Sequence, residues 1–351
     1  MRLLISVFLL AVTAVAFAAG EDTRELRPVP VIQDGWLDVS SSAGQGRVPV
    51  HATLDWSLAQ PQIQRAVIFI HGQLRSDLHS GERSIRMASS ASQNTISITP
   101  QFLIAEDVAA HQLPDSTLRW GVNDWKTGFN AKAPAPISSF AVVDTIIEHL
   151  LDHKIFPNLE LIVLAGHSAG GQYVQRYALL GQGSNLIDKG GVKVRYVVAN
   201  TSSYAYSDDM RPTADGRFAP FDAGKCDRVS RWPYGMNANL PAYVRKPVSP
   251  QAMTKEFLQR DVIYLLGEED KDPNHPDLDK TCAGEAQGES RLVRGRFYFA
   301  YAAQFDPGHR MNQRLFLVPG VGHGADGMYS SSCGLAALYE EGVCSTASAA
   351  R

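Results

Sequence analysis

The hydrophobic and polar positions of this chain follow two patterns that predict different elements. Short runs rich in apolar and β-branched residues are typical of buried strands, and they occur at 66–70, 95–100, 161–165, 194–199, 262–266 and 315–318. Helix-like stretches lie between or after them, at 81–92, 138–153, 169–180 and 284–303. In 138–153 the apolar residues lie three or four positions apart, which is the spacing of an amphipathic helix. Strands that alternate with helices predict an α/β protein with a mostly parallel sheet covered on both faces.

Three segments depart from this alternation. Residues 36–58 contain two strand-like stretches around the turn-forming residues 41–46, which predicts an antiparallel hairpin at the start of the sheet. Residues 101–136 are loop-like. Residues 201–250 are rich in Pro, Gly and aromatic residues and lie between the sixth and seventh predicted strands.

The first 18 residues form a pattern of their own. An early Arg, a long apolar run and a terminal Ala-Phe-Ala predict a secretory signal peptide cut after Ala18, which leaves 19–351 as the mature domain. The alternative is an uncleaved anchor, because the run from 3 to 19 approaches the length of a membrane span. No later apolar run is long enough to span a bilayer. We therefore expect a secreted or periplasmic protein without a stable membrane span once the signal peptide is removed.

Charge and length narrow the class of protein. The chain has 33 Lys and Arg against 36 Asp and Glu, a formal net charge of −3, and this balance argues against nucleic acid as a partner. Its 351 residues are compatible with two domains or with one elaborated α/β domain. The order of the motifs described next favours one domain.

The four cysteines, Cys226, Cys282, Cys333 and Cys344, show no C-x-x-C pair, and no histidines stand at zinc-finger spacing. A metal site is therefore not predicted. In an oxidising compartment an even number of cysteines is typical of disulfides. Three pairings are possible, and we favour Cys226 with Cys282 and Cys333 with Cys344, because the second pair is close in sequence.

The strongest motif is Gly166-His167-Ser168-Ala169-Gly170, which stands between a buried-strand run and a helical pattern. In a strand-turn-helix context, a G-x-S-x-G turn holds its serine at a strained apex, and glycines flank it because a Cβ would clash. The alternative is a glycine-rich turn with an incidental serine. The flanking elements favour Ser168 as a nucleophile.

A serine hydroxyl needs a base to accept its proton and a third group to orient that base. Two later strands end in residues of the required kinds. The strand at 262–266 is followed by Gly-Glu-Glu-Asp, ending at Asp270, and the strand at 315–318 by a glycine-rich loop that contains His323. Because the carboxyl ends of parallel strands meet at one edge of a sheet, these residues can converge on Ser168.

With these motifs the chain resembles the α/β-hydrolase superfamily from about residue 66 to residue 339. The resemblance implies that Ser168 is the nucleophile, His323 the general base and acid, and Asp270 the orienting carboxylate. Asp272 and Glu269 are the next candidates for the acid, since both lie in the same loop. The backbone N–H groups of Ala169 and Gln73 would form the oxyanion hole, Gln73 following the His-Gly turn.

The superfamily commonly carries a cap between the sixth and seventh strands, which here is 201–250. Its aromatic residues, Tyr204 and Trp232 among them, are candidates to line the substrate pocket, as are Trp120 and Trp125 in the preceding loop. The alternative is that these rings pack the cap onto the body of the domain. An aromatic cap favours a hydrophobic acyl or alcohol group over a highly charged one.

Other motifs are interpreted as structural. We expect His71 to be a hydrogen-bonded turn residue and His167 to pack beneath the nucleophile. Residues 322–327 match G-x-G-x-x-G, but too little chain follows to complete a dinucleotide-binding unit. Residues 270–281 begin like a calcium loop but lack its glycine and its final glutamate. No cofactor is predicted.

The sequence thus predicts an exported serine hydrolase, and among these a carboxylic ester hydrolase that acts on a small-molecule or lipid-like ester through an acyl-enzyme. A secreted amidase or peptidase of the same fold is the alternative enzyme. A binding protein without turnover is the alternative from another class, and the presence of Ser, Asp and His argues against it. The sequence leaves the substrate and the oligomeric state open.

Overall fold

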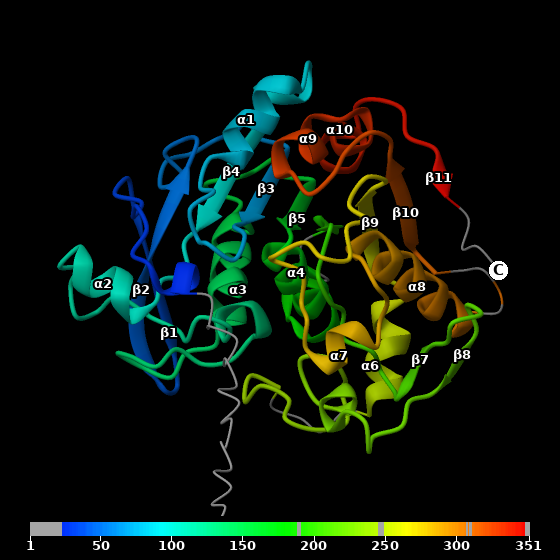
Figure 1. The fold of residues 1–351 in the computed structure, drawn as a ribbon. Coiled ribbons are helices and arrows are strands. Elements are labelled where there is room, and N and C mark those ends of the chain that lie inside the picture. Colours follow the sequence, from blue (N-terminus) through cyan, green and yellow to red (C-terminus); the bar gives the residue numbers. More distant parts are fainter. Residues whose placement is uncertain (1–22, 188–190, 245–248, 307, 309–310, 348–351) are drawn as a thin grey trace, which may run out of the picture.

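The computed structural model describes residues 23–187, 191–244, 249–306, 308 and 311–347. The predicted signal peptide, 1–18, lies outside the described residues. Figure 1 shows a central sheet with helices on both sides. No helix in the described part of the chain is long and apolar enough to cross a membrane.

The central sheet has nine strands in the order β1-β2-β4-β3-β5-β6-β9-β10-β11. Their bounds are β1 (Trp36–Ser41), β2 (Gly44–Ala52), β3 (Arg65–Ile70), β4 (Thr95–Pro100), β5 (Leu161–His167), β6 (Lys193–Ala199), β9 (Asp261–Gly267), β10 (Gln313–Val318) and β11 (Thr346–Ala347). Neighbours from β4 to β10 are parallel, and only the edge pairs β1–β2, β2–β4 and β10–β11 are antiparallel. The predicted mostly parallel sheet is confirmed, and so is the opening hairpin.

Two helical layers cover the sheet. The α-helices are α1 (Ser80–Met87), α2 (Ala105–Ala110), α3 (Ser139–Leu150), α4 (Ala169–Leu180), α5 (Gly183–Ile187), α6 (Pro250–Phe257), α7 (Cys282–Glu285), α8 (Arg291–Gln304), α9 (Ala325–Ser330) and α10 (Ser332–Tyr339). The 3₁₀ helices are η1 (Thr23–Leu26), η2 (Ala91–Gln93), η3 (Trp125–Thr127) and η4 (Asp227–Ser230). Helices α3, α4 and α8 pack on one face, and α1, α9 and α10 on the other.

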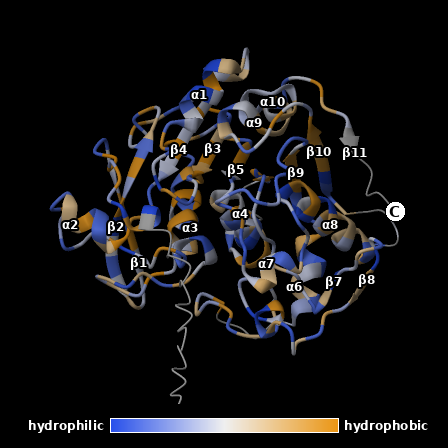
Figure 2. Ribbon diagram, in the orientation of Figure 1, coloured by the Kyte–Doolittle hydropathy of each residue, from blue (hydrophilic) through white to orange (hydrophobic). Residues whose placement is uncertain are grey.

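Each central strand contributes alternate residues to two hydrophobic cores. In β5, Ile162 and Leu164 belong to the core under α3 and α4, whereas Val163 and Ala165 belong to the core under α9 and α10. A strand buried on both faces has no polar positions to alternate, which explains its continuous apolar run. Figure 2 shows the hydrophobic colours gathered in these central strands.

Several short elements differ from the sequence-based expectation. The helix expected at 284–303 is divided into α7 and α8, and the expected loop at 101–136 contains α2 and η3. The last strand is followed by α9, α10 and β11, which the hydrophobic pattern did not predict. Helices of four to eight residues are too short to show a clear 3.6-residue period.

The segment 201–250 contains a small two-stranded sheet, β7 (Met210–Pro212) with β8 (Phe218–Pro220), and η4. A disulfide between Cys226 and Cys282 joins this segment to α7, with its Cα atoms 5.9 Å apart. A second disulfide joins Cys333 of α10 to Cys344. Both favoured pairings are therefore present in the structure.

Candidate active site

Ser168 lies at the apex of the turn from β5 into α4. Its backbone has φ 58° and ψ −118°, a left-handed conformation that is strained for a residue with a side chain. The turn is tight, because a Cβ on Gly166 would lie 2.2 Å from the carbonyl oxygen of Gly170, and one on Gly170 would lie 2.1 Å from that of Ile70. The two glycines of the motif are thus required by close backbone approach.

His323 and Asp270 meet Ser168 at the carboxyl edge of the sheet. The Nε2 atom of His323 lies 3.1 Å from the Ser168 hydroxyl oxygen, and its Nδ1 atom lies 2.8 Å from a carboxylate oxygen of Asp270. Since a carboxylate can only accept, Nδ1 carries the proton and Nε2 is left to accept from the serine. This geometry allows the serine proton to pass to the imidazole.

Asp270 has surroundings that the neighbouring acids lack. Its side chain is 2% exposed, and the guanidinium of Arg291, itself fully buried, lies 3.4 Å from its second oxygen. Glu269 instead pairs with Lys271 in solvent (2.7 Å), and Asp272 is exposed. Arg291, at the start of α8, was not identified from the sequence, because no motif precedes it.

The turn after β3 brings Gln73 beside Ser168, where both line the same two hollows. His71 fixes this turn: its Nε2 accepts from the backbone N–H of Phe102 (3.0 Å), so its Nδ1–H donates to the carbonyl of Gly72 (2.9 Å). Burial lowers the pKa of His71 to about 4, which keeps the ring neutral. The contacts match the expected role of a turn residue.

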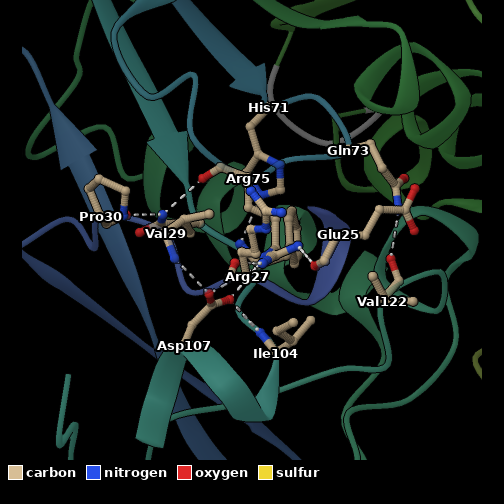
Figure 3. Close-up of polar contacts among 12 residues, drawn as sticks. Glu25, Arg27, Val29, Pro30, His71, Gln73, Arg75, Ile104, Asp107 and Val122 are labelled. Carbon is tan, nitrogen blue, oxygen red and sulfur yellow. Dashed lines mark hydrogen bonds and ion pairs between the residues drawn. The ribbon is translucent and has the colours of Figure 1, made fainter. Parts of the chain in front are cut away.

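A buried ion pair also anchors the loop after β3 (Figure 3). Arg75, in left-handed conformation with φ 56°, pairs with Asp107 at 2.9 Å, and neither side chain is exposed. Arg75 also donates to the carbonyls of Glu25 (2.8 Å) and Arg27 (3.2 Å), while Asp107 accepts from the backbone N–H of Ile104 (3.0 Å). The loop and the N-terminal segment are therefore held together. No motif in the sequence indicates this pair.

Two further histidines surround His323 without entering the hydrogen-bonded chain. The ring of His167 lies 4.6 Å from that of His323, and the ring of His275 lies 5.0 Å from it. Burial lowers the pKa of His167 well below its usual range, so it is neutral. The expectation that His167 packs beneath the nucleophile is wrong, because the residue is half-buried and lines the hollow that His323 also lines.

Two hollows open on Ser168. The larger, about 460 Å³, lies between η3, α4 and the segments around Tyr234 and Asp279, and its charged lining includes Lys126 and Arg176. The smaller, about 250 Å³, is lined by the loop after β3 and by His323. Only the smaller hollow includes His323 in its lining.

The aromatic residues expected to line the pocket are buried elsewhere. Trp120, Trp125, Tyr204 and Trp232 are each at most 3% exposed and line neither hollow. The ring of Tyr204 stacks on that of Tyr298 in α8 at 4.5 Å. These large rings pack segments onto the core. The prediction that they line the pocket is therefore wrong, and the hollows have the polar lining described above.

One group of possible metal ligands occurs among the described residues. His51, His79 and Glu82 place one ligand atom each within 4.8 Å of one another, on β2 and beside α1. The Nε2 atom of His51 already contacts Glu82 (3.0 Å), and its Nδ1 contacts Asp34. None of these residues lines either hollow.

The fold of the chain has counterparts among solved structures. The chain is similar to a poly(aspartic acid) hydrolase from Sphingomonas sp. KT-1, with a TM-score of 0.57 and 22% identity over 85% of this chain and 96% of that one. It is also similar to a poly(3-hydroxybutyrate) depolymerase from Bordetella parapertussis, with a TM-score of 0.55 and 20% identity over 86% and 88%. No protein-family profile matches the sequence, and no curated protein does. At these identities the likeness is one of fold.

Proposed function

We propose that this chain, which has the α/β-hydrolase fold, is an exported serine hydrolase that cleaves carboxylic esters through an acyl-enzyme. The observation that carries the proposal is the continuous hydrogen-bonded chain from Ser168 through His323 to Asp270, with separations of 3.1 and 2.8 Å. Three residues from distant parts of the sequence meet in the order that nucleophilic acyl transfer requires.

In the proposed reaction, the Ser168 oxygen attacks the ester carbonyl while Nε2 of His323 takes the hydroxyl proton. The tetrahedral intermediate then collapses, the carbon–oxygen bond to the alcohol breaks, and His323 returns the proton to the leaving alcohol. Water repeats the sequence on the acyl-enzyme and releases the acid. Asp270 keeps Nδ1 protonated and stabilises the imidazolium, and Arg291 holds Asp270 in place.

Negative charge on the carbonyl oxygen needs fixed donors. The backbone N–H groups of Ala169, the first residue of α4, and Gln73 are proposed to provide them. Preorganised donors of this kind lower barriers by about 3–4 kcal/mol each. The His71 hydrogen bonds and the Arg75–Asp107 pair support this role because they fix the loop that carries Gln73.

Two further observations support parts of the proposal. Both structural neighbours are named as enzymes that degrade polymers by hydrolysis or depolymerisation, which supports hydrolysis as the reaction class. The two disulfides are typical of an oxidising compartment and support export, together with the predicted signal peptide at 1–18. N-terminal sequencing of the exported protein should then begin at Ala19.

The test of the activity is hydrolysis of 4-nitrophenyl esters of increasing chain length, beside the matching 4-nitroanilides, by the mature protein and by Ser168→Ala. We expect the esters to be cleaved and the variant to lose at least about a thousandfold in kcat. Anilides cleaved faster than esters would favour an amidase. Equal rates for the variant and the wild type would refute a role for Ser168.

A further inference from the structure

Three cations line the larger hollow: Lys126 in η3, Arg176 in α4 and Arg228 in η4. The guanidinium of Arg228 lies over the ring of Tyr234, 5.4 Å from its centroid. The Lys126 ammonium donates to the side-chain oxygen of Gln73 (2.6 Å), and Arg176 donates to the carbonyls of Pro233 and Lys126 (both 3.3 Å). Within the described part of the chain, no carboxylate lies at ion-pair distance from Lys126 or Arg176.

This arrangement is energetically unfavourable in the free protein. A charge removed from water is ordinarily paired, because desolvation costs several kcal/mol per ion. Here burial, together with the neighbouring Arg176, lowers the pKa of Lys126 to about 8, and burial lowers that of Arg176 to about 10. Lys126 is partly exposed in the wall of the hollow, and Arg176 lies in the same wall with 1% of its surface exposed. Cations kept there under this penalty are suited to an anion that enters from outside.

The acids that line the hollow do not supply that anion. Three have partners elsewhere: Asp124 pairs with Lys132 (2.8 Å), Asp277 with Arg24 (2.7 Å), and Asp279 accepts from the hydroxyl of Tyr234 (2.8 Å). The fourth, Glu25, raises the pKa of Lys126 through space without pairing with it. Figure 3 shows the Glu25 side chain extending toward Gln73, the residue that Lys126 contacts. The Glu25 carboxylate therefore competes with a substrate carboxylate for the space near Lys126.

The position of His323 indicates which part of the substrate the cations meet. The leaving alcohol takes its proton from His323, which lines only the smaller hollow. The acyl part is therefore directed to the larger one. Arg176 lies in α4, eight residues after Ser168, which corresponds to about 12 Å along the helix axis. An anionic group of the substrate that reaches Arg176 must therefore lie several bonds from the ester carbonyl.

On the basis of the proposed function, we propose that the larger hollow binds a carboxylate on the acyl part of the ester through Lys126 and Arg176. The substrate class is then the half-esters of dicarboxylic acids and related acidic acyl esters. This is the opposite of the hydrophobic acyl group that an aromatic cap suggests.

The test compares mono-4-nitrophenyl adipate with its uncharged methyl ester, which differs only at the distal carboxylate. We expect kcat/KM to favour the acid by about tenfold or more at low salt, because a charge-assisted contact is lost in the methyl ester. The preference should shrink as salt is added, since screening weakens the attraction. A ratio of one or below would overturn the proposal.

Three variants make the test specific to this site. Lys126→Met should reduce the preference for the acid about tenfold, whereas Lys154→Met, a control at an exposed lysine that lines neither hollow, should leave it unchanged. Glu25→Gln should increase the preference, because it removes the competing carboxylate. A preference that survives in Lys126→Met, or falls equally in Lys154→Met, would contradict the assignment.

Failure of this inference is distinguishable from failure of the proposed function. If both esters are cleaved at equal rates by a route that requires Ser168, the serine hydrolase remains and the carboxylate site is refuted. If neither ester is cleaved and Ser168 is unreactive, the proposed function itself fails.

Discussion

At the scale of single residues, Asp270 and Asp272 stand two positions apart but differ in surroundings. Asp270 is buried against His323 and Arg291, whereas Asp272 is exposed. Asp270→Asn should lower kcat by about 10³–10⁴-fold, because the amide no longer fixes the histidine tautomer. Asp272→Asn should stay within about twofold in the same ester assay. Loss of activity in Asp272→Asn alone would assign the role of orienting carboxylate to Asp272.

The titration of the Lys126 ammonium should make the affinity for an acidic substrate depend on pH. Its pKa is about 8, lowered by burial and by Arg176 and raised by Glu25 and Asp279; Arg228 and Asp124 also face the same hollow. The ammonium is charged below pH 8 and neutral above it. For mono-4-nitrophenyl adipate, KM should therefore rise as pH increases through about 8, while KM for the methyl ester changes little.

Lys126→Arg is the matched control for that titration, because a guanidinium stays charged across the measured range. Its KM for the acid should stay low up to pH 9. A rise in KM that is the same in this variant and the wild type would assign the pH effect to another group.

At the scale of elements, the ion pair between Arg75 and Asp107 fastens the loop after β3 to α2 and to the N-terminal segment. Asp107→Asn leaves Arg75 as an uncompensated buried charge, so we expect a loss of about 3–5 kcal/mol in the free energy of unfolding, measured by denaturant titration. Arg217→Met, which breaks an exposed pair with Asp215, should leave the free energy of unfolding nearly unchanged. Similar losses for both variants would contradict a clamp at this position.

The elements predicted well from sequence are those with one dominant pattern. The strands β3, β5 and β9 are buried on both faces, so their apolar runs are unbroken, and the turn at Ser168 follows from its two glycines. The charged lining of the larger hollow could not be predicted from such a pattern. All residues of α4 are buried, so no amphipathic spacing distinguishes Arg176 from a core position. The aromatic composition suggested a pocket lining, but Tyr204 packs against Tyr298 of α8, and Trp120 and Trp125 pack against Phe102.

At the scale of the whole molecule, the two disulfides close loops of different length. The chain between Cys226 and Cys282 spans 56 residues, and that between Cys333 and Cys344 spans 11. Loop-closure entropy gives about 4 kcal/mol for the first and about 3 kcal/mol for the second. Cys226→Ser with Cys282→Ser should thus lower the thermal midpoint more than Cys333→Ser with Cys344→Ser. The reverse order would show that native-state contacts, and not loop length, set these contributions.

The central claim is that Ser168 is activated for attack on a carbonyl. Its most direct test is to treat the mature protein with a fluorophosphonate and to map the adduct by peptide mass spectrometry. We expect one adduct, on the peptide that contains Ser168, and none in Ser168→Ala. We also expect slower labelling in His323→Ala, because the base is missing. A folded wild-type protein that forms no adduct, or forms it on another residue, would contradict the claim.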